Sequence, residues 1–142
     1  MPQQRIEALM FTLLLSRQAE RVFALLRIVY GMMWSFHGVQ KVFGFQAKFQ
    51  PKFPTQLWFG GIIELVAGVL IALGLFTRCA AFVASGTMAV AYLQFHWKLQ
   101  LGTGLIPTVN QGELAVVYCF AFLYIACRGP GLWSLDAVRT AK

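Results

Sequence analysis

Four long apolar stretches dominate the chain, and each contains or begins at an ionisable side chain. They cover about residues 22–43, 57–76, 79–97 and 113–127. A helix needs about 20 mostly apolar residues to cross the hydrocarbon core of a bilayer. With 58% apolar and only 12% charged residues in 142, the chain has the composition of an integral membrane protein and no room for a separate soluble domain. We predict an all-α fold, a transmembrane bundle of four helices.

Polar or glycine-rich segments divide these stretches. Pro51 and Pro54 lie in the loop after the first stretch, and a tight turn at residues 74–78 separates the second from the third. A loop rich in glycine leads from residue 98 to the fourth stretch, and the sequence GPG at residues 129–131 follows it. Proline and glycine interrupt or end helices, so these segments set the boundaries of the four spans.

The first 21 residues differ from the rest. They hold a short apolar run with charged residues on both sides and lack the small-x-small pattern of a signal-peptide cleavage site. We predict an amphipathic helix that lies on the membrane surface over residues 1–21, followed by the membrane domain over residues 22–142.

The net charge of +7 reflects membrane orientation and not nucleic-acid binding, because the basic residues are spread along the chain and mostly flank apolar stretches. With the N-terminus in the cytoplasm, the cytoplasmic side holds Arg5, Arg17, Arg21, Arg78, Arg128, Arg139 and Lys142. The outer side then holds Lys41, Lys48, Lys52 and Lys98. The positive-inside rule therefore predicts cytoplasmic N- and C-termini.

Each predicted span has one face that carries polar or small residues at helical spacing. In the first span these are Arg27, Gly31, Trp34, Gly38 and Lys41, with Tyr30 and His37 at the edge. In the others they are Gly60, Glu64 and Gly68; Ser85, Ala89, Tyr92 and His96; and Glu113, Val117, Phe120 and Tyr124. Ionisable side chains are costly in a bilayer unless they pair or face water, so these faces should turn inward.

In an up-and-down bundle, five of the ionisable side chains gather in the outer half: His37, Lys41, Glu64, His96 and Glu113. Three interpretations are open. The groups form an ion-pair network that locks the bundle, they line a pocket for a headgroup, a quinone ring or an ion, or the two histidines and two glutamates hold a metal. No short spacing supports the metal site.

Several motifs occur in a characteristic order. They are Arg27 with Gly31, HG-x-x-K at residues 37–41, GGIIE at 60–64, LGLFTR at 73–78, His96, NQGE at 110–113 and GPGLWSLD at 129–136. In these the chain resembles the DoxX family of small bacterial membrane proteins, over nearly everything after residue 22. The resemblance implies a four-helix protein of the bacterial inner membrane, and it points to Arg27, Lys41, Glu64, His96, Asn110 and Glu113. NQGE departs from the NGGE frequent in the family, which bears on the loop geometry.

The family is named for a subunit of a thiosulfate:quinone oxidoreductase, so the resemblance implies a membrane redox system linked to quinone or sulfur. The sequence has no haem CxxCH, no cluster-binding cysteine set and no GxGxxG, so redox activity would need a partner enzyme. The candidate ligand-binding residues are Arg27, Trp34, His37, Lys41, Glu64, Tyr92, His96, Asn110 and Glu113. Glu64 and Glu113 are the candidates for proton transfer, and we predict no resident metal. The alternatives are a non-catalytic membrane scaffold and, ranked last, a small-solute or proton transporter; a homo-oligomer is compatible with each.

Overall fold

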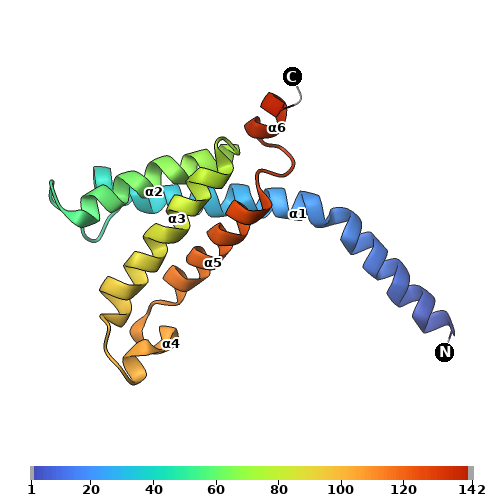
Figure 1. Cartoon of the computed structure of the whole chain (residues 1–142), viewed down its shortest axis with the longest axis horizontal. Coiled ribbons are helices and arrows are strands. Elements are labelled where there is room, and N and C mark those ends of the chain that lie inside the picture. The colour runs from blue at the N-terminus through green and yellow to red at the C-terminus, as the bar shows by residue number, and fades with distance from the viewer. Residues whose placement is uncertain (1, 141–142) are drawn as a thin grey trace.

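The computed structural model describes residues 2–140 and contains no strand within them, which confirms the all-α prediction. Its elements are α1 (Pro2–Phe43), α2 (Gln56–Leu73), α3 (Thr77–Ala91), the π-helical turn η1 (Tyr92–Trp97), the 3-10 turn η2 (Thr103–Leu105), α4 (Pro107–Asn110), α5 (Glu113–Arg128) and α6 (Leu135–Thr140) (Figure 1). Within the described residues, two helices are long and apolar enough to cross a membrane by themselves, at Arg5–Phe43 and Gln56–Leu73. The helices lie on the four predicted stretches, but the first begins well before its stretch.

The first helix is longer than the sequence predicted. α1 runs unbroken from residue 2 to residue 43, so residues 2–21 continue the same helix as residues 22–43; residue 1 of the predicted surface segment lies outside the described residues. No glycine or proline occurs between Gln3 and Tyr30, so nothing in the sequence interrupts the hydrogen-bond ladder. At 1.5 Å per residue α1 is about 63 Å long, twice the hydrocarbon thickness. Its N-terminal part projects away from the other helices (Figure 1), and its described side chains from Gln3 to Val22 are all exposed.

α1 and α2 form a tight antiparallel hairpin through glycines spaced seven residues apart. A Cβ atom added to Gly38 would lie 2.3 Å from the nitrogen of Leu65, and one added to Gly68 would lie 2.8 Å from the oxygen of Gly31. The two backbones therefore touch, as small residues in membrane helices allow. The sequence predicted that Gly68 allows this close approach, as observed. On the other side of Glu64 the glycine in contact with α1 is Gly61, since a Cβ added to it would lie 2.7 Å from the Cβ of Lys41.

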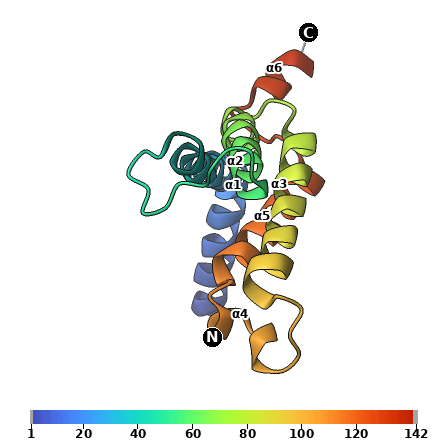
Figure 2. The ribbon, with the colours of Figure 1, turned by 90° about the vertical axis from the view of Figure 1, so that its left-hand side faces the viewer.

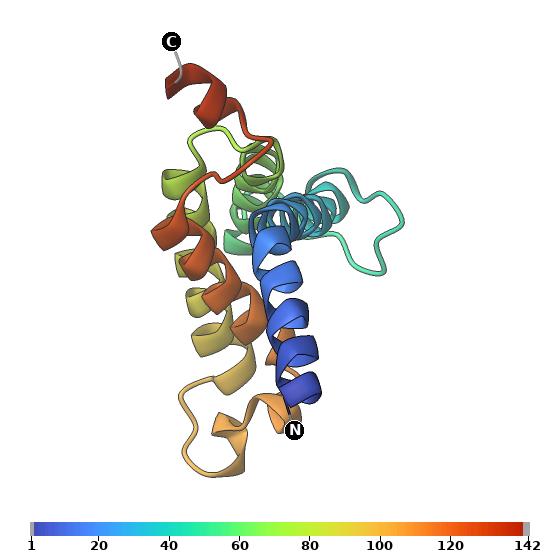
Figure 3. The same cartoon turned by 90° about the vertical axis from the view of Figure 1, so that its right-hand side faces the viewer.

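α3 and α5 form the second hairpin, which crosses the first. In Figure 3 the part of α1 next to α2 is seen nearly end-on, while α3 and α5 run down the page; Figure 2 shows the same crossing from the other side. Three aromatic pairs join α1 to α5, with ring centroids 4.9 Å apart for Trp34–Phe122, 5.4 Å for Tyr30–Tyr118 and 5.7 Å for Phe23–Tyr124. Large aromatic rings therefore keep α1 and α5 apart, whereas glycines let α1 and α2 come into backbone contact. The helices are therefore arranged as two crossed hairpins, and a bundle of four membrane-spanning helices stays a prediction.

Arg27 ties three segments together at one end of the α1–α2 hairpin. It is fully buried. One terminal nitrogen, Nη1, donates to the carbonyl oxygens of Ile71 (2.6 Å) and Ala72 (2.8 Å). The other, Nη2, donates to those of Trp133 (2.8 Å) and Leu132 (3.3 Å). The last carbonyls of a helix lack partners within it and carry partial negative charge, so a guanidinium is a favourable cap for α2.

Arg78 caps the C-terminus of α5 in the same way. Its Nη1 donates to the carbonyl oxygens of Ala126 (2.8 Å) and Cys127 (2.5 Å), and its Nη2 to that of Arg128 (3.2 Å). The guanidinium lies close against Gly129, whose φ of +94° is in a region that side chains rarely adopt. We call Arg27, Arg78 and their carbonyl partners the arginine end.

Asp136 completes the arginine end from the C-terminal segment. Its carboxylate accepts hydrogen bonds from the backbone nitrogens of Phe76 (3.0 Å) and Thr77 (2.9 Å) and from the Thr77 hydroxyl (2.8 Å). Partial burial alone raises the pKa of Asp136, but the hydrogen bonds from Thr77 and Phe76 outweigh it, so the pKa lies below its ordinary value. The side chain therefore caps the N-terminus of α3 from 59 residues away in the sequence.

Candidate functional site

A cavity of about 500 Å³ lies between α2 and the continuous helix of α3 and η1. Lys41, Glu64 and His96 line its polar part. Phe59 and Phe95 line it as well and are exposed on the helix surface, so the cavity opens sideways through an apolar rim. Small-molecule sites in proteins have volumes of about 300–1,000 Å³, mostly apolar walls and a few polar groups. This cavity, which we call the α2–α3 cavity, fits that description.

Two glycines keep the cavity open. Gly60 of α2 and Gly86 of α3 both line it, and a Cβ added to either would meet no atom of the described chain within 4 Å. The sequence assigned Gly60 to helix contact, which is wrong, because Gly61 faces α1 instead. Helix propensity favours alanine over glycine at such positions by about 1 kcal/mol. Nothing in the packing of these two positions requires glycine.

Lys41 and Glu64 form an ion pair at the cavity, with 2.5 Å between Nζ of Lys41 and Oε1 of Glu64. Only 6% of the Glu64 side chain is exposed, against 32% of the Lys41 side chain. The second carboxylate oxygen, Oε2, is buried and has no hydrogen-bond partner among the described residues. An unpaired buried polar atom costs about 1–3 kcal/mol, and more when it carries charge. The carboxylate is therefore only half satisfied by the protein.

His96 is positioned by the loop that follows it. Its Nδ1 lies 3.3 Å from the carbonyl oxygen of Asn110, and its ring stacks against that of Tyr92 at a centroid distance of 6.4 Å. His96 belongs to the π-helical turn η1, a helix form that often occurs at functional sites. The structure thus brings together Lys41, Glu64 and His96 from three separate elements, which are three of the five side chains predicted to gather; a ligand-binding role for them stays a prediction.

Tyr92 and Asn110, two other predicted ligand-binding residues, hold the loop in place. The Tyr92 hydroxyl donates to the carbonyl oxygen of Leu105 (2.5 Å). The Asn110 side chain donates through Nδ2 to the carbonyl oxygen of Gly104 (2.8 Å) and accepts through Oδ1 from the nitrogen of Gly112 (2.8 Å). Both side chains act on the cavity through the position of His96, and neither lines the cavity.

The remaining predicted residues lie elsewhere. Arg27 belongs to the arginine end. Trp34 is 1% exposed and donates from Nε1 to the sulfur of Met88 (3.1 Å). His37 is half-buried, with its ring 6.4 Å from that of Tyr118. Glu113 is exposed in the first turn of α5, where the helix dipole favours a carboxylate.

The inward face of the fourth predicted span is wrong. Val117, Phe120 and Tyr124 are exposed, whereas Tyr118 and Phe122 are buried. The predicted face was the one that carries Glu113. A carboxylate at a helix N-terminus reaches water, so it does not show which face of the rest of α5 turns inward. Tyr118 was missed for this reason. Its hydroxyl is buried without a hydrogen-bond partner in the described part of the chain.

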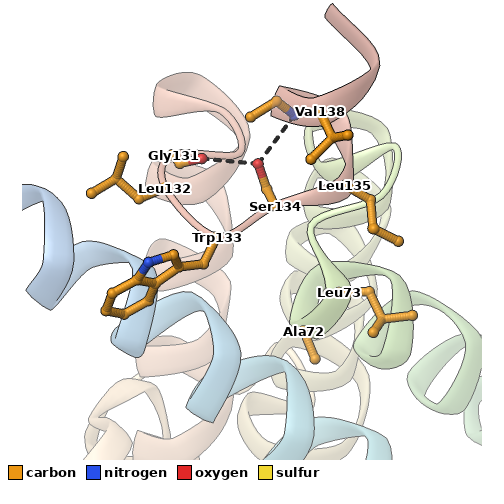
Figure 4. Close-up of a pocket in the computed structure, with 9 residues that line it drawn as sticks. Ala72, Leu73, Gly131, Leu132, Trp133, Ser134, Leu135 and Val138 are labelled. Carbon is orange, nitrogen blue, oxygen red and sulfur yellow. Dashed lines mark hydrogen bonds between the residues drawn. The ribbon is translucent and has the colours of Figure 1, made fainter. Parts of the chain in front are cut away.

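A larger cavity, of about 890 Å³, lies at the other end between the end of α2 and the segment 131–138 (Figure 4). Its lining is almost entirely apolar, with Leu73, Leu132 and Leu135 among its residues. Ser134 is one polar side chain in it; its hydroxyl donates to the carbonyl oxygen of Gly131 (2.9 Å) and accepts from the nitrogen of Ala137 (3.3 Å). This cavity offers no unpaired polar side-chain atom within residues 2–140.

The metal interpretation is not supported. No group of three or more His, Cys, Asp or Glu side chains that could hold a metal ion occurs in the described residues. His37 and Glu113 do not line the cavity with Glu64 and His96, so the set of two histidines and two glutamates does not assemble.

The family model of DoxX matches residues 22–97. These residues include α2, α3 and η1, and with them Lys41, Glu64 and His96. An uncharacterized protein of Haemophilus influenzae is 39% identical over 117 residues, which is 80% of this chain and 87% of that protein. No solved structure matches the chain. The chain belongs to the DoxX family of membrane-associated proteins.

Proposed function

We propose that the chain is a multi-pass protein of the bacterial inner membrane with both termini in the cytoplasm. α1 and α2 each have the length and composition of a span. α3 and η1 are continuous, with 15 and six residues, and α5 has 16, so each nearly spans about 30 Å of hydrocarbon. The arginine end then lies at the cytoplasmic side and the α2–α3 cavity in the outer half. The exposed N-terminal part of α1 extends beyond the cytoplasmic surface, because α1 is unbroken and about twice as long as the hydrocarbon is thick.

Within this membrane protein we propose that the α2–α3 cavity binds a lipid-soluble ring compound of the quinone class, on behalf of a partner redox enzyme. The half-satisfied carboxylate of Glu64 carries this proposal: Glu64 lines the cavity, and the oxygen that Lys41 does not hold is buried without a partner among the described residues. The sideways apolar opening suits a ligand that enters from the bilayer with its tail toward lipid.

The lining residues have distinct roles in such a site. Lys41 donates to a ring oxygen, and His96 forms a second polar contact at the helix end. Glu64 pairs with Lys41, and its carboxyl group can relay protons from water to a ring oxygen as the ring is reduced. A bound quinone supplies the two-electron chemistry; electrons come from the partner, because the sequence contains no motif for a redox cofactor.

The experiment is to purify the chain in native lipid particles and identify co-purifying small molecules by mass spectrometry, in the unmodified chain and in Gly60→Leu. The added side chain fills the cavity and meets no neighbour at its Cβ. A quinone should co-purify with the unmodified chain and be depleted at least tenfold in Gly60→Leu. Val66→Phe, at an exposed α2 position outside the cavity, is the matched control. Absence of any quinone, or equal retention in all three proteins, would contradict the proposal.

A further inference from the structure

We infer that the α2–α3 cavity selects a ligand that donates hydrogen bonds, and so binds the dihydroxy form of the ring in preference to the quinone. This inference rests on the proposed function and names the form of the ligand. It comes from the hydrogen-bonding state of the groups in the cavity wall, taken one at a time.

The tautomer of His96 is set by its neighbour. A carbonyl oxygen can only accept a hydrogen bond, so the contact of Nδ1 with the Asn110 carbonyl (3.3 Å) requires the hydrogen on Nδ1. In the neutral imidazole the other nitrogen, Nε2, then keeps a lone pair. The ring nitrogen left for a ligand is therefore an acceptor.

Two more groups are acceptors. Oε2 of Glu64 is buried without a partner among the described residues, and a carboxylate only accepts. Thr87 lines the cavity and gives its hydroxyl hydrogen to the carbonyl oxygen of Val83 (2.9 Å), which leaves its oxygen lone pairs. Lys41 is a donor, and one of its three hydrogens already points to Oε1 of Glu64. The polar wall is rich in acceptors.

A ring hydroxyl matches this wall better than a ring carbonyl. When the Glu64 carboxylate turns Oε2 toward the cavity, one hydroxyl can donate to Oε2 and accept from Lys41 at the same time. A carbonyl can accept from Lys41 but gives Oε2 no donor, so this oxygen stays unpaired. Hydrogen bonds to charged groups are among the stronger ones in proteins, so the dihydroxy form should bind roughly tenfold tighter or more.

Three probes with the same ring and tail test the inference. They are a decyl benzoquinone, its dihydroxy form kept reduced under argon, and the dimethyl ether of the dihydroxy form, which cannot donate. Retention of each on lipid nanodiscs that carry the full chain is measured across a concentration series, and retention on empty nanodiscs is subtracted. The same series is run on Glu64→Gln and on Glu113→Gln, whose carboxylate is exposed and outside the cavity.

The dihydroxy probe should bind at least tenfold tighter than the quinone and the ether. The preference should shrink in Glu64→Gln, whose amide can donate to a carbonyl, and persist in Glu113→Gln. Quinone binding equal to or tighter than dihydroxy binding would overturn the inference and leave the proposed function standing. Absence of saturable binding of every probe would overturn both. The comparison in the unmodified chain decides the matter even if Glu64→Gln does not fold.

Discussion

The two ends of the molecule deal with buried charge in opposite ways. At the arginine end, the terminal nitrogens of fully buried Arg27 meet four backbone carbonyls. At the α2–α3 cavity, Glu64 has one oxygen on Lys41 and the other on nothing the described chain provides. Nε of Arg27 is also buried without a partner among the described residues, but Arg27 lines neither cavity, whereas Glu64 lines the α2–α3 cavity. Neither burial nor an unmade hydrogen bond alone therefore marks a candidate functional charge; an unmade hydrogen bond on a residue that lines a cavity does.

The largest effect should come from Arg27→Met. It removes four hydrogen bonds and leaves carbonyls of two segments without their donor, so we expect the free energy of unfolding in detergent to fall by about 3 kcal/mol or more. Arg21→Met is the matched control, because Arg21 is exposed and contacts the side chain of Gln18. The measurement is chemical unfolding followed by circular dichroism. Equal stability of the two variants would show that the hydrogen bonds of Arg27 do not stabilise the fold.

A smaller effect should follow from Gly38→Ala. The added Cβ would lie 2.3 Å from the nitrogen of Leu65, so the hairpin must open. We expect the free energy of unfolding to fall by about 2 kcal/mol. Gly60→Ala, on the cavity side of α2, meets nothing there and should be neutral or stabilising through helix propensity. Thermal unfolding of both variants checks this. A loss of stability in Gly60→Ala equal to that in Gly38→Ala would show that the cavity wall is packed.

The smallest effect on stability should come from Glu64→Gln. The amide relieves a buried charge that is only half paired, and the partly exposed Lys41 can turn to water, so we expect a loss of about 1 kcal/mol or less. The same unfolding assay measures it. A loss as large as that of Arg27→Met would favour the alternative in which the Lys41–Glu64 pair is a structural lock of a non-catalytic scaffold.

Much of the fold was predictable from the sequence, because hydropathy and turn residues locate helices well. The glycine-notched face of α1 also follows from its spacing, and Arg27, Gly31, Trp34 and Gly38 are all buried. The crossing of the hairpins was not predictable, since it depends on which large rings meet. Three aromatic pairs between α1 and α5 are long-range contacts that no local pattern encodes.

The candidate site was predicted only in part, for a similar reason. Lys41, Glu64 and His96 do share a cavity, because their depths in successive spans agree. Arg27 is also an ionisable side chain in an apolar stretch, and it lies on the same face of α1 as Lys41. Its carbonyl partners, however, lie 44 and more residues away in the sequence. The sequence shows which charges are buried, but it does not show which of them the backbone already satisfies.

The most direct test of the central claim is an experimental structure of the chain in lipid. The account predicts density in the α2–α3 cavity between Lys41, Glu64 and His96, with a polar atom of the bound molecule within about 3 Å of Oε2 of Glu64. A cavity closed by side chains, with Oε2 hydrogen-bonded to the protein itself, would contradict it, because Glu64 would then have no unpaired oxygen for a ligand.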